Sequence, residues 1–154
     1  MTRTCIIVAD SKHARFFSVD ASDVQRRPLL VEGSVLFNPE IEASRGNGTR
    51  RAQTRRVSNR QAGLVHPVVA QRERHRLELE RRFGREIAGQ AGKITGAWPS
   101  GTVILVAAPH VLGLMRETLR DALHPGIELK ELAKDYGALS GAELSDRLSF
   151  LRPA

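Results

Sequence analysis

Seven arginines in one stretch of the chain are the residues most suited to a binding function. They lie between Ala43 and Arg72, where the sequence contains no aspartate or glutamate. These arginines are Arg45, Arg50, Arg51, Arg55, Arg56, Arg60 and Arg72. Arginine suits phosphate because its planar guanidinium donates paired hydrogen bonds to oxygen atoms. The pattern therefore predicts an anionic partner, with RNA or a ribonucleoprotein as the favoured one.

The net charge of the protein comes entirely from this stretch. The chain of 154 residues has 24 basic and 17 acidic residues, which gives a formal net charge of +7. Without the seven arginines, 17 basic residues face 17 acidic ones, so the remainder is neutral. Such asymmetry indicates an anionic partner for one region rather than a generally basic surface. A solvated loop that maintains solubility, an acidic protein partner and a membrane surface are the alternative interpretations.

Most of the same stretch is predicted to be a mobile loop. Residues 43–67 are rich in Arg, Gly, Asn, Ser, Thr and Gln, and their only large apolar residues are Val57, Leu64 and Val65. This apolar surface is too small to offset the entropy lost when the chain becomes ordered. Loops of this length inside a compact domain are often functional. Because this loop has no aromatic residue, we do not expect it to read the sequence of a single strand.

The histidines form no metal-binding or catalytic pattern. They are His13, His66, His75, His110 and His124. None has the spacing of a metal-binding helix motif, and none has a visible nucleophile partner. His75 shares the apolar stripe of a predicted helix, so we expect a packed side chain. Dinucleotide-binding loops and nucleophile elbows are also missing. The sequence therefore indicates no metal and no cofactor.

The single cysteine and the lengths of the apolar runs indicate the environment of the protein. Cys5 has no partner for an internal disulfide, and we expect it to be buried and inert. No segment approaches the roughly 20 apolar residues that span a bilayer. The N-terminal apolar run is too short for the core of a signal peptide. We therefore expect a cytoplasmic protein.

Three strands are predicted before the arginine-rich stretch, at residues 4–9, 14–19 and 29–37. The short links between them favour an antiparallel meander. In the third strand the apolar residues alternate from Leu29 to Phe37, with Glu32 and Ser34 on the opposite face. This period of two predicts a strand with one wet face.

Alternating helices and strands are predicted after the arginine-rich stretch. The pattern gives helices at 68–90 and 110–123 and strands at 102–108 and 127–132. The continuous apolar run at 102–108 predicts a strand buried on both faces, which is typical of a central parallel strand. Ser140, followed by glutamate three residues later, predicts a capping box at the start of a last helix.

Three groups of residues resemble a known bacterial family. They are Val8-Ala9-Asp10 before Ala14-Arg15-Phe16-Phe17, Ile104-Leu105-Val106-Ala107-Ala108-Pro109 before Leu112-Gly113-Leu114-Met115-Arg116, and Lys134-Asp135-Tyr136 before Leu139-Ser140. In this order and spacing the chain resembles the family called "protein required for attachment to host cells". That family looks like a bacterial relative of the middle domain of archaeal and eukaryotic release factors. The resemblance covers most of the chain and is weakest at residues 43–69.

A chain of 154 residues has the usual length of one domain, so we expect a single domain over residues 1–154. The resemblance implies an α/β fold of the ribonuclease-H-like type, with helices packed on a mixed sheet. It also implies work on RNA or at the ribosome. Release factors carry Gly-Gly-Gln in the corresponding loop, whereas this chain has Gln61 without the paired glycines. Asp10 and Asp135 follow strands, where carboxylates could hold magnesium for phosphodiester cleavage. A turn role for Asp10 and a surface role for Asp135 are the favoured interpretations.

The leading hypothesis is a non-enzymatic binding protein for RNA or the ribosome that uses the arginine-rich loop. One alternative is a hydrolase that acts on RNA through Asp10 and Asp135, or on peptidyl-tRNA through Gln61. Another alternative is an adhesion or scaffold protein that binds a protein partner.

Overall fold

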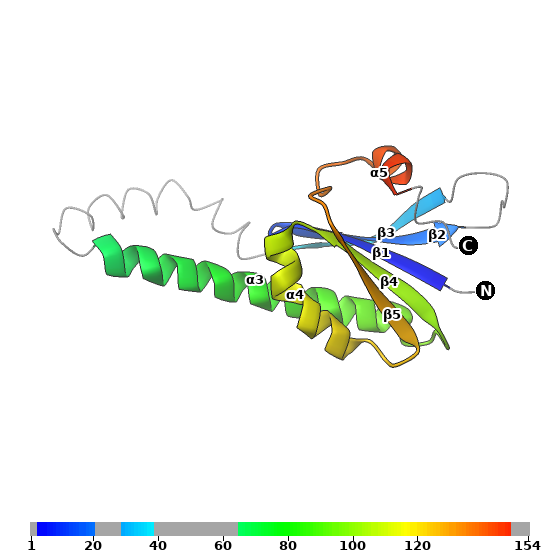
Figure 1. The fold of residues 1–154 in the computed structure, drawn as a ribbon, viewed down its shortest axis with the longest axis horizontal. Coiled ribbons are helices and arrows are strands. Elements are labelled where there is room, and N and C mark those ends of the chain that lie inside the picture. Colours follow the sequence, from blue (N-terminus) through cyan, green and yellow to red (C-terminus); the bar gives the residue numbers. More distant parts are fainter. Residues whose placement is uncertain (1–2, 21–28, 39–64, 149–154) are drawn as a thin grey trace.

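The computed structural model describes residues 3–20, 29–38 and 65–148 (Figure 1). Five strands and three helices lie in these ranges. They are β1 (Arg3–Ala9), β2 (His13–Asp20), β3 (Leu29–Phe37), α3 (Val65–Thr95), β4 (Gly101–Ala107), α4 (Pro109–Ala122), β5 (Ile127–Ala133) and α5 (Gly141–Arg147).

The strands form one mixed sheet in the order β3-β2-β1-β4-β5. β2 is antiparallel to both β1 and β3, which confirms the predicted meander. β4 lies parallel between β1 and β5, as its apolar sequence predicted. Val103, Leu105, Val106 and Ala107 are fully buried, because helices cover both faces of the sheet at this central strand.

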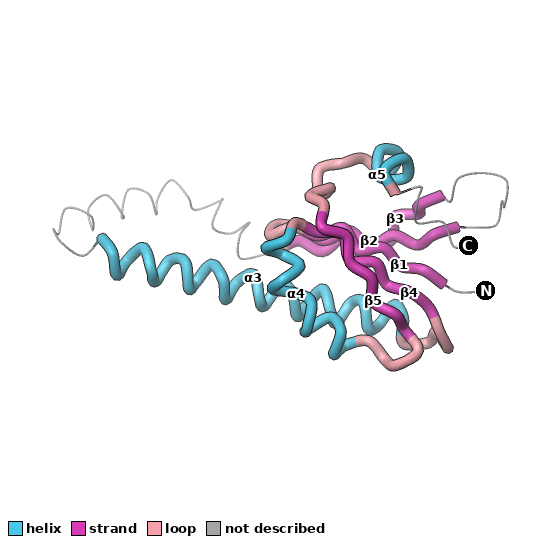
Figure 2. Tube along the Cα trace, viewed as in Figure 1, coloured by secondary structure: helices cyan, strands magenta, loops and turns pink. Residues whose placement is uncertain are grey.

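Two layers of side chains hold the helices to the sheet. α3 and α4 cover one face and α5 covers the other (Figure 2). On the first face Phe16, Phe83 and Leu105 belong to one buried cluster. On the second face Phe17 and Leu144 belong to another. The predicted capping box is confirmed, since Ser140 accepts a hydrogen bond from the backbone of Glu143 and that side chain accepts one in return.

The predicted strict alternation along β3 is wrong in one respect. Arg15 pairs with Val35, but Phe17 pairs with Glu32, so β3 has one residue more than β2 in this interval. A bulge of this kind moves the following side chains to the opposite face. Val35 and Phe37 therefore share a face with Arg15 and His13, and they are exposed rather than buried.

Helix α3 is longer than the predicted 68–90 and extends well past the sheet (Figure 1). Leu79, Phe83 and Ile87 are buried, as the apolar stripe predicted. The prediction of a packed His75 is wrong, because this residue is exposed. It lies one turn before Leu79, where α3 has left the cover of the sheet. The apolar stripe of a helix in the sequence does not indicate at which residue the sheet stops packing on that helix.

These elements form a single mixed α/β unit around one sheet, and this arrangement is compatible with the predicted ribonuclease-H-like class. Within the described ranges no helix combines the length and apolar character needed to cross a membrane.

Candidate nucleic-acid interface

The candidate site lies at the edge of the sheet where β1, β4 and β5 end. Because these strands are parallel, the residues that follow them meet at one edge. The start of β2 and the end of β3 lie there as well, since both strands are antiparallel to their neighbours. Asp10, His13, Phe37 and Gly137 are therefore brought close together from distant parts of the sequence.

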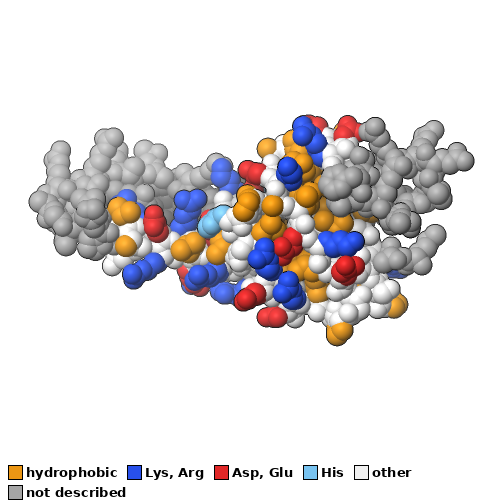
Figure 3. Space-filling model, viewed as in Figure 1, with side chains coloured by type: hydrophobic (Ala, Val, Ile, Leu, Met, Phe, Trp, Pro, Cys, Tyr) orange, Lys and Arg blue, Asp and Glu red, His pale blue; other side chains and the backbone are white. Residues whose placement is uncertain are grey.

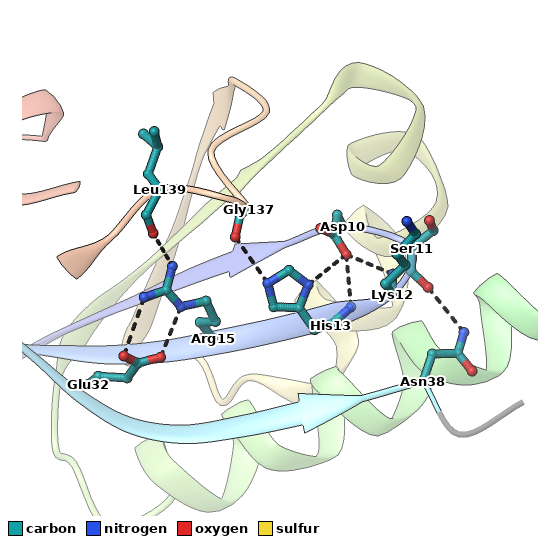
Figure 4. Close-up of polar contacts among 9 residues, drawn as sticks. All are labelled: Asp10, Ser11, Lys12, His13, Arg15, Glu32, Asn38, Gly137 and Leu139. Atoms are coloured by element: carbon teal, nitrogen blue, oxygen red, sulfur yellow. Dashed lines mark hydrogen bonds and ion pairs between the residues drawn. The ribbon is translucent and has the colours of Figure 1, made fainter. Parts of the chain in front are cut away.

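Asp10 organises the turn between β1 and β2 (Figure 4). Its Oδ1 atom accepts hydrogen bonds from the backbone N–H groups of Lys12 at 2.7 Å and His13 at 2.8 Å. The Nδ1 atom of His13 lies 3.1 Å from the same oxygen, and its Nε2 atom lies 3.0 Å from the carbonyl of Gly137. Both ring nitrogens therefore face acceptors, so His13 links this turn to the segment after β5.

Arg15 makes a second link across the same region (Figure 4). Its guanidinium donates to both carboxylate oxygens of Glu32, at 2.9 and 3.3 Å, and to the carbonyl of Leu139. The side-chain hydrogen bond from Arg15 holds the pKa of Glu32 below its ordinary value, and the charges of Arg15 and His13 add to this effect. Since Arg15 is engaged on both sides, we do not count it among the phosphate-binding arginines.

Phe37 is an exposed aromatic residue that sequence reasoning did not identify. It is 60% exposed and stacks with an interplanar angle of 19° on His13, with ring centroids 6.4 Å apart. The alternation along β3 suggested a buried side chain, and the bulge reverses its face. A bulge in strand pairing leaves little trace in a single sequence. The sequence of this protein therefore gave no signal that Phe37 is exposed.

The two candidate metal-binding carboxylates do not form a metal centre in the described structure. Asp10 is engaged by its own turn, and its Oδ2 atom lies against Gly137. Asp135 is exposed. No group of three or more His, Cys, Asp or Glu residues suited to a metal lies within residues 3–20, 29–38 and 65–148.

A buried carboxylate joins α3 to α4 beside this edge. Glu80 is 3% exposed, and its Oε2 atom lies 3.0 Å from Nε2 of His110. Its Oε1 atom lies 3.5 Å from Nε of Arg76. The side chains of His110 and Arg76 are themselves mostly exposed, at 61% and 73%. The cluster therefore resembles a structural link more than a catalytic centre, because the contacts of Glu80 within the described ranges include no nucleophile.

Two further titratable side chains, those of His124 and Cys5, have structural surroundings. Nε2 of His124 lies 2.8 Å from the carbonyl of Trp98. Cys5 is buried as predicted, and burial raises the pKa of its thiol to about 12. A thiol with such a pKa is protonated at neutral pH and is a poor nucleophile.

Of the predicted phosphate-binding arginines, the structure describes Arg72. It is half-buried on the first half of α3. The other six, Arg45, Arg50, Arg51, Arg55, Arg56 and Arg60, lie outside the described residues, as does Gln61.

Further arginines follow Arg72 along α3. Exposed Arg74 and Arg81 are seven residues apart, so they lie on one face of the helix, about 10 Å from each other. Neither makes an ion pair with any residue in the described part of the chain. By contrast, Arg82 and Arg85 pair with Glu78, at 3.7 and 3.5 Å. Figure 3 shows basic side chains along the part of α3 that extends past the sheet. The basic character of the preceding segment thus continues onto the helix.

A family comparison bears on this geometry. The model of the family described as "Protein required for attachment to host cells" matches residues 5–148. The chain belongs to this family. The matched residues include the whole sheet from Cys5 onward and all three described helices. A comparison with curated proteins gave no match. The family description names a phenotype and no chemistry.

Proposed function

We propose that this host-attachment family protein is a non-enzymatic, cytoplasmic binding protein for RNA or the ribosome. In this proposal Arg45, Arg50, Arg51, Arg55, Arg56, Arg60 and Arg72 contact phosphate groups. In the same proposal, the folded sheet positions the segment that carries them. A relationship to the middle domain of release factors is part of the same proposal, because it would place the protein at the ribosome.

The observation that carries the proposal is the concentration of the whole net charge in one acid-free stretch. The described helix that follows supports it, since Arg74 and Arg81 are exposed and have no ion-pair partner in the described ranges. Guanidinium groups spaced along one face of a helix suit the repeating phosphates of a nucleic-acid backbone. The described carboxylates give no comparable support to magnesium-dependent cleavage, because Asp10 is engaged in its turn.

The proposal can be tested by co-sedimentation of the full-length protein with ribosomes and with total RNA across a salt series. A loop variant would replace Arg50, Arg51, Arg55, Arg56 and Arg60 with serine. If all five contact a single strand, the slope of log affinity against log salt should fall by roughly 3 to 4.

A matched control removes the same number of positive charges elsewhere. Five exposed basic residues of the described chain serve for this variant, also with serine: Lys93, Arg120, Lys130, Lys134 and Arg147. The control should keep the wild-type salt slope within about one unit, since these five residues take no part in the proposed phosphate contact. Equal losses in the two variants would show a general charge effect and contradict the proposed site. Absence of binding by the wild type at low salt would end the proposal.

A further inference from the structure

The backbone on both sides of Phe37 is held firmly at the end of β3. Phe37 pairs with His13 in the antiparallel register of β2 and β3. The next residue, Asn38, is 3% exposed, and its backbone N–H donates to the carbonyl of Lys12 at 2.8 Å. Its side-chain amide donates to the carbonyl of Ser11 at 3.2 Å. A fixed backbone and a ring with two torsions leave little entropy to lose when a ligand packs on the ring.

The ring that backs Phe37 is fixed as well. His13 is held through Nδ1 by Asp10 and through Nε2 by the carbonyl of Gly137. Phe37 stacks on this ring, yet 60% of the residue stays exposed. The bulge in β3 is what brings Phe37 to this position, and bulges often re-aim side chains beside functional sites. The result is a preorganised aromatic surface that contacts solvent.

The surroundings of Phe37 suit a nucleic-acid base better than a protein surface. Exposed Lys12, which makes no ion pair within the described ranges, belongs to the turn that bonds Asn38. The chain then leads into the acid-free stretch, whose first arginine, Arg45, comes eight residues after Phe37. Pairing of β3 with a second copy is disfavoured by the bulge and by the charge of Glu32 on this edge strand.

We propose that Phe37 is a stacking platform for one unpaired base of single-stranded RNA. In this proposal the nearby Lys12 contacts the phosphate backbone of the RNA. This proposal rests on the proposed function and adds to it the form of RNA that is bound. Stacking tolerates any base, because every base offers a π-face. The platform therefore favours unpaired RNA over a duplex, in which bases are covered by their neighbours.

The experiment measures binding of the full-length protein to a fluorescently labelled single-stranded RNA of 12 nucleotides by anisotropy. Phe37→Ala should weaken binding roughly five- to 150-fold, the range expected for one stacked base. Phe37→Leu should weaken it similarly, whereas Phe37→Trp should retain it, since an aromatic face is what matters. The salt slope should stay unchanged in all three variants, because none alters a charge.

Matched controls separate stacking from other effects. Val31→Ala changes another exposed apolar residue of β3, on the opposite face, and should leave affinity unchanged. An RNA of the same length whose nucleotides are abasic should bind the wild type and Phe37→Ala equally. Thermal unfolding should differ little between these two proteins, because Phe37 is mostly exposed.

Three results would overturn the stacking site. They are wild-type affinity in Phe37→Ala, an equal loss on the abasic strand, and a dimer in sedimentation velocity that Phe37→Ala dissociates. The last result would make a second copy of the chain the occupant. The two proposals fail separately: RNA binding that is insensitive to Phe37 overturns only the platform. If the wild type binds no RNA at low salt, both are overturned.

Discussion

Glu80 of α3 and His110 of α4 are joined by a contact of 3.0 Å between Oε2 and Nε2, although 30 positions separate them in the sequence. Glu80 is one of three buried polar or charged residues of the described chain, and its partners reach it from the surface. The pair fixes the start of α4 against the middle of α3. It also lies where α3 leaves the sheet, so it stabilises the base of the projecting helix.

Removal of the histidine partner should destabilise the fold. His110→Ala leaves the buried Oε2 of Glu80 without its described partner, which should lower the free energy of unfolding by about 1–3 kcal/mol. Urea unfolding followed by circular dichroism measures this change. His75→Ala is the matched control on α3, because that side chain is exposed, and it should stay within about 0.5 kcal/mol of wild type. Equal effects of the two substitutions would show that the contact with Glu80 contributes nothing specific.

The close packing of Gly137 against Asp10 gives a second prediction. A Cβ atom at Gly137 would lie 2.5 Å from Oδ2 of Asp10, so Gly137→Ala must displace the carboxylate that holds the β1–β2 turn. The expected loss of stability is about 1–3 kcal/mol. Gly89→Ala provides the contrast, since nothing lies within 4 Å of its added carbon on α3. That helix substitution should raise stability by about 0.5–1 kcal/mol. A Gly137→Ala protein as stable as wild type would contradict this packing.

The Arg15–Glu32 pair predicts a change of stability with acid. Arg15 keeps the pKa of Glu32 in the folded protein below its unfolded value of 4.5. The pair therefore stabilises the fold above pH 4.5, and this contribution disappears as the pH falls through the lower, folded-state pKa. Wild type and Glu32→Gln should accordingly differ in unfolding free energy near pH 6 and converge toward pH 3. Chemical denaturation across this range measures the difference. A constant difference would mean that Glu32 acts through its shape and not its charge.

The buried thiol predicts slow chemical modification. Cys5 is 2% exposed, and burial raises its pKa to about 12, so little thiolate is present at pH 8. A chromogenic disulfide reagent should therefore react with the native protein far more slowly than with protein unfolded in guanidinium. Absorbance over time measures both rates. Rapid reaction of the native protein would show that β1 is accessible at its amino end.

Local patterns alone predicted a large part of the fold. Continuous apolar runs predicted β1 and β4 as buried strands, since only a strand covered on both faces can bury every side chain. Ser140 and Glu143 predicted the start of α5, because that capping depends on residues three apart. Charge counting located the acid-free stretch, and this remains the basis of the proposed function.

Relations between distant residues were decided by the tertiary structure. The bulge in β3 depends on how β3 pairs with β2, so strict alternation wrongly predicted a buried Phe37. The exposure of His75 depends on where the sheet stops covering α3. The helical periodicity of the sequence does not give this position. His13 and Gly137 are 124 positions apart, and their contact exists because β1 and β5 end at the same edge. The sequence by itself determined most helices and strands and the location of the positive charge, because these depend on residues close together in the chain. The structure decided which side chains share an edge, because only the strand order brings those residues together.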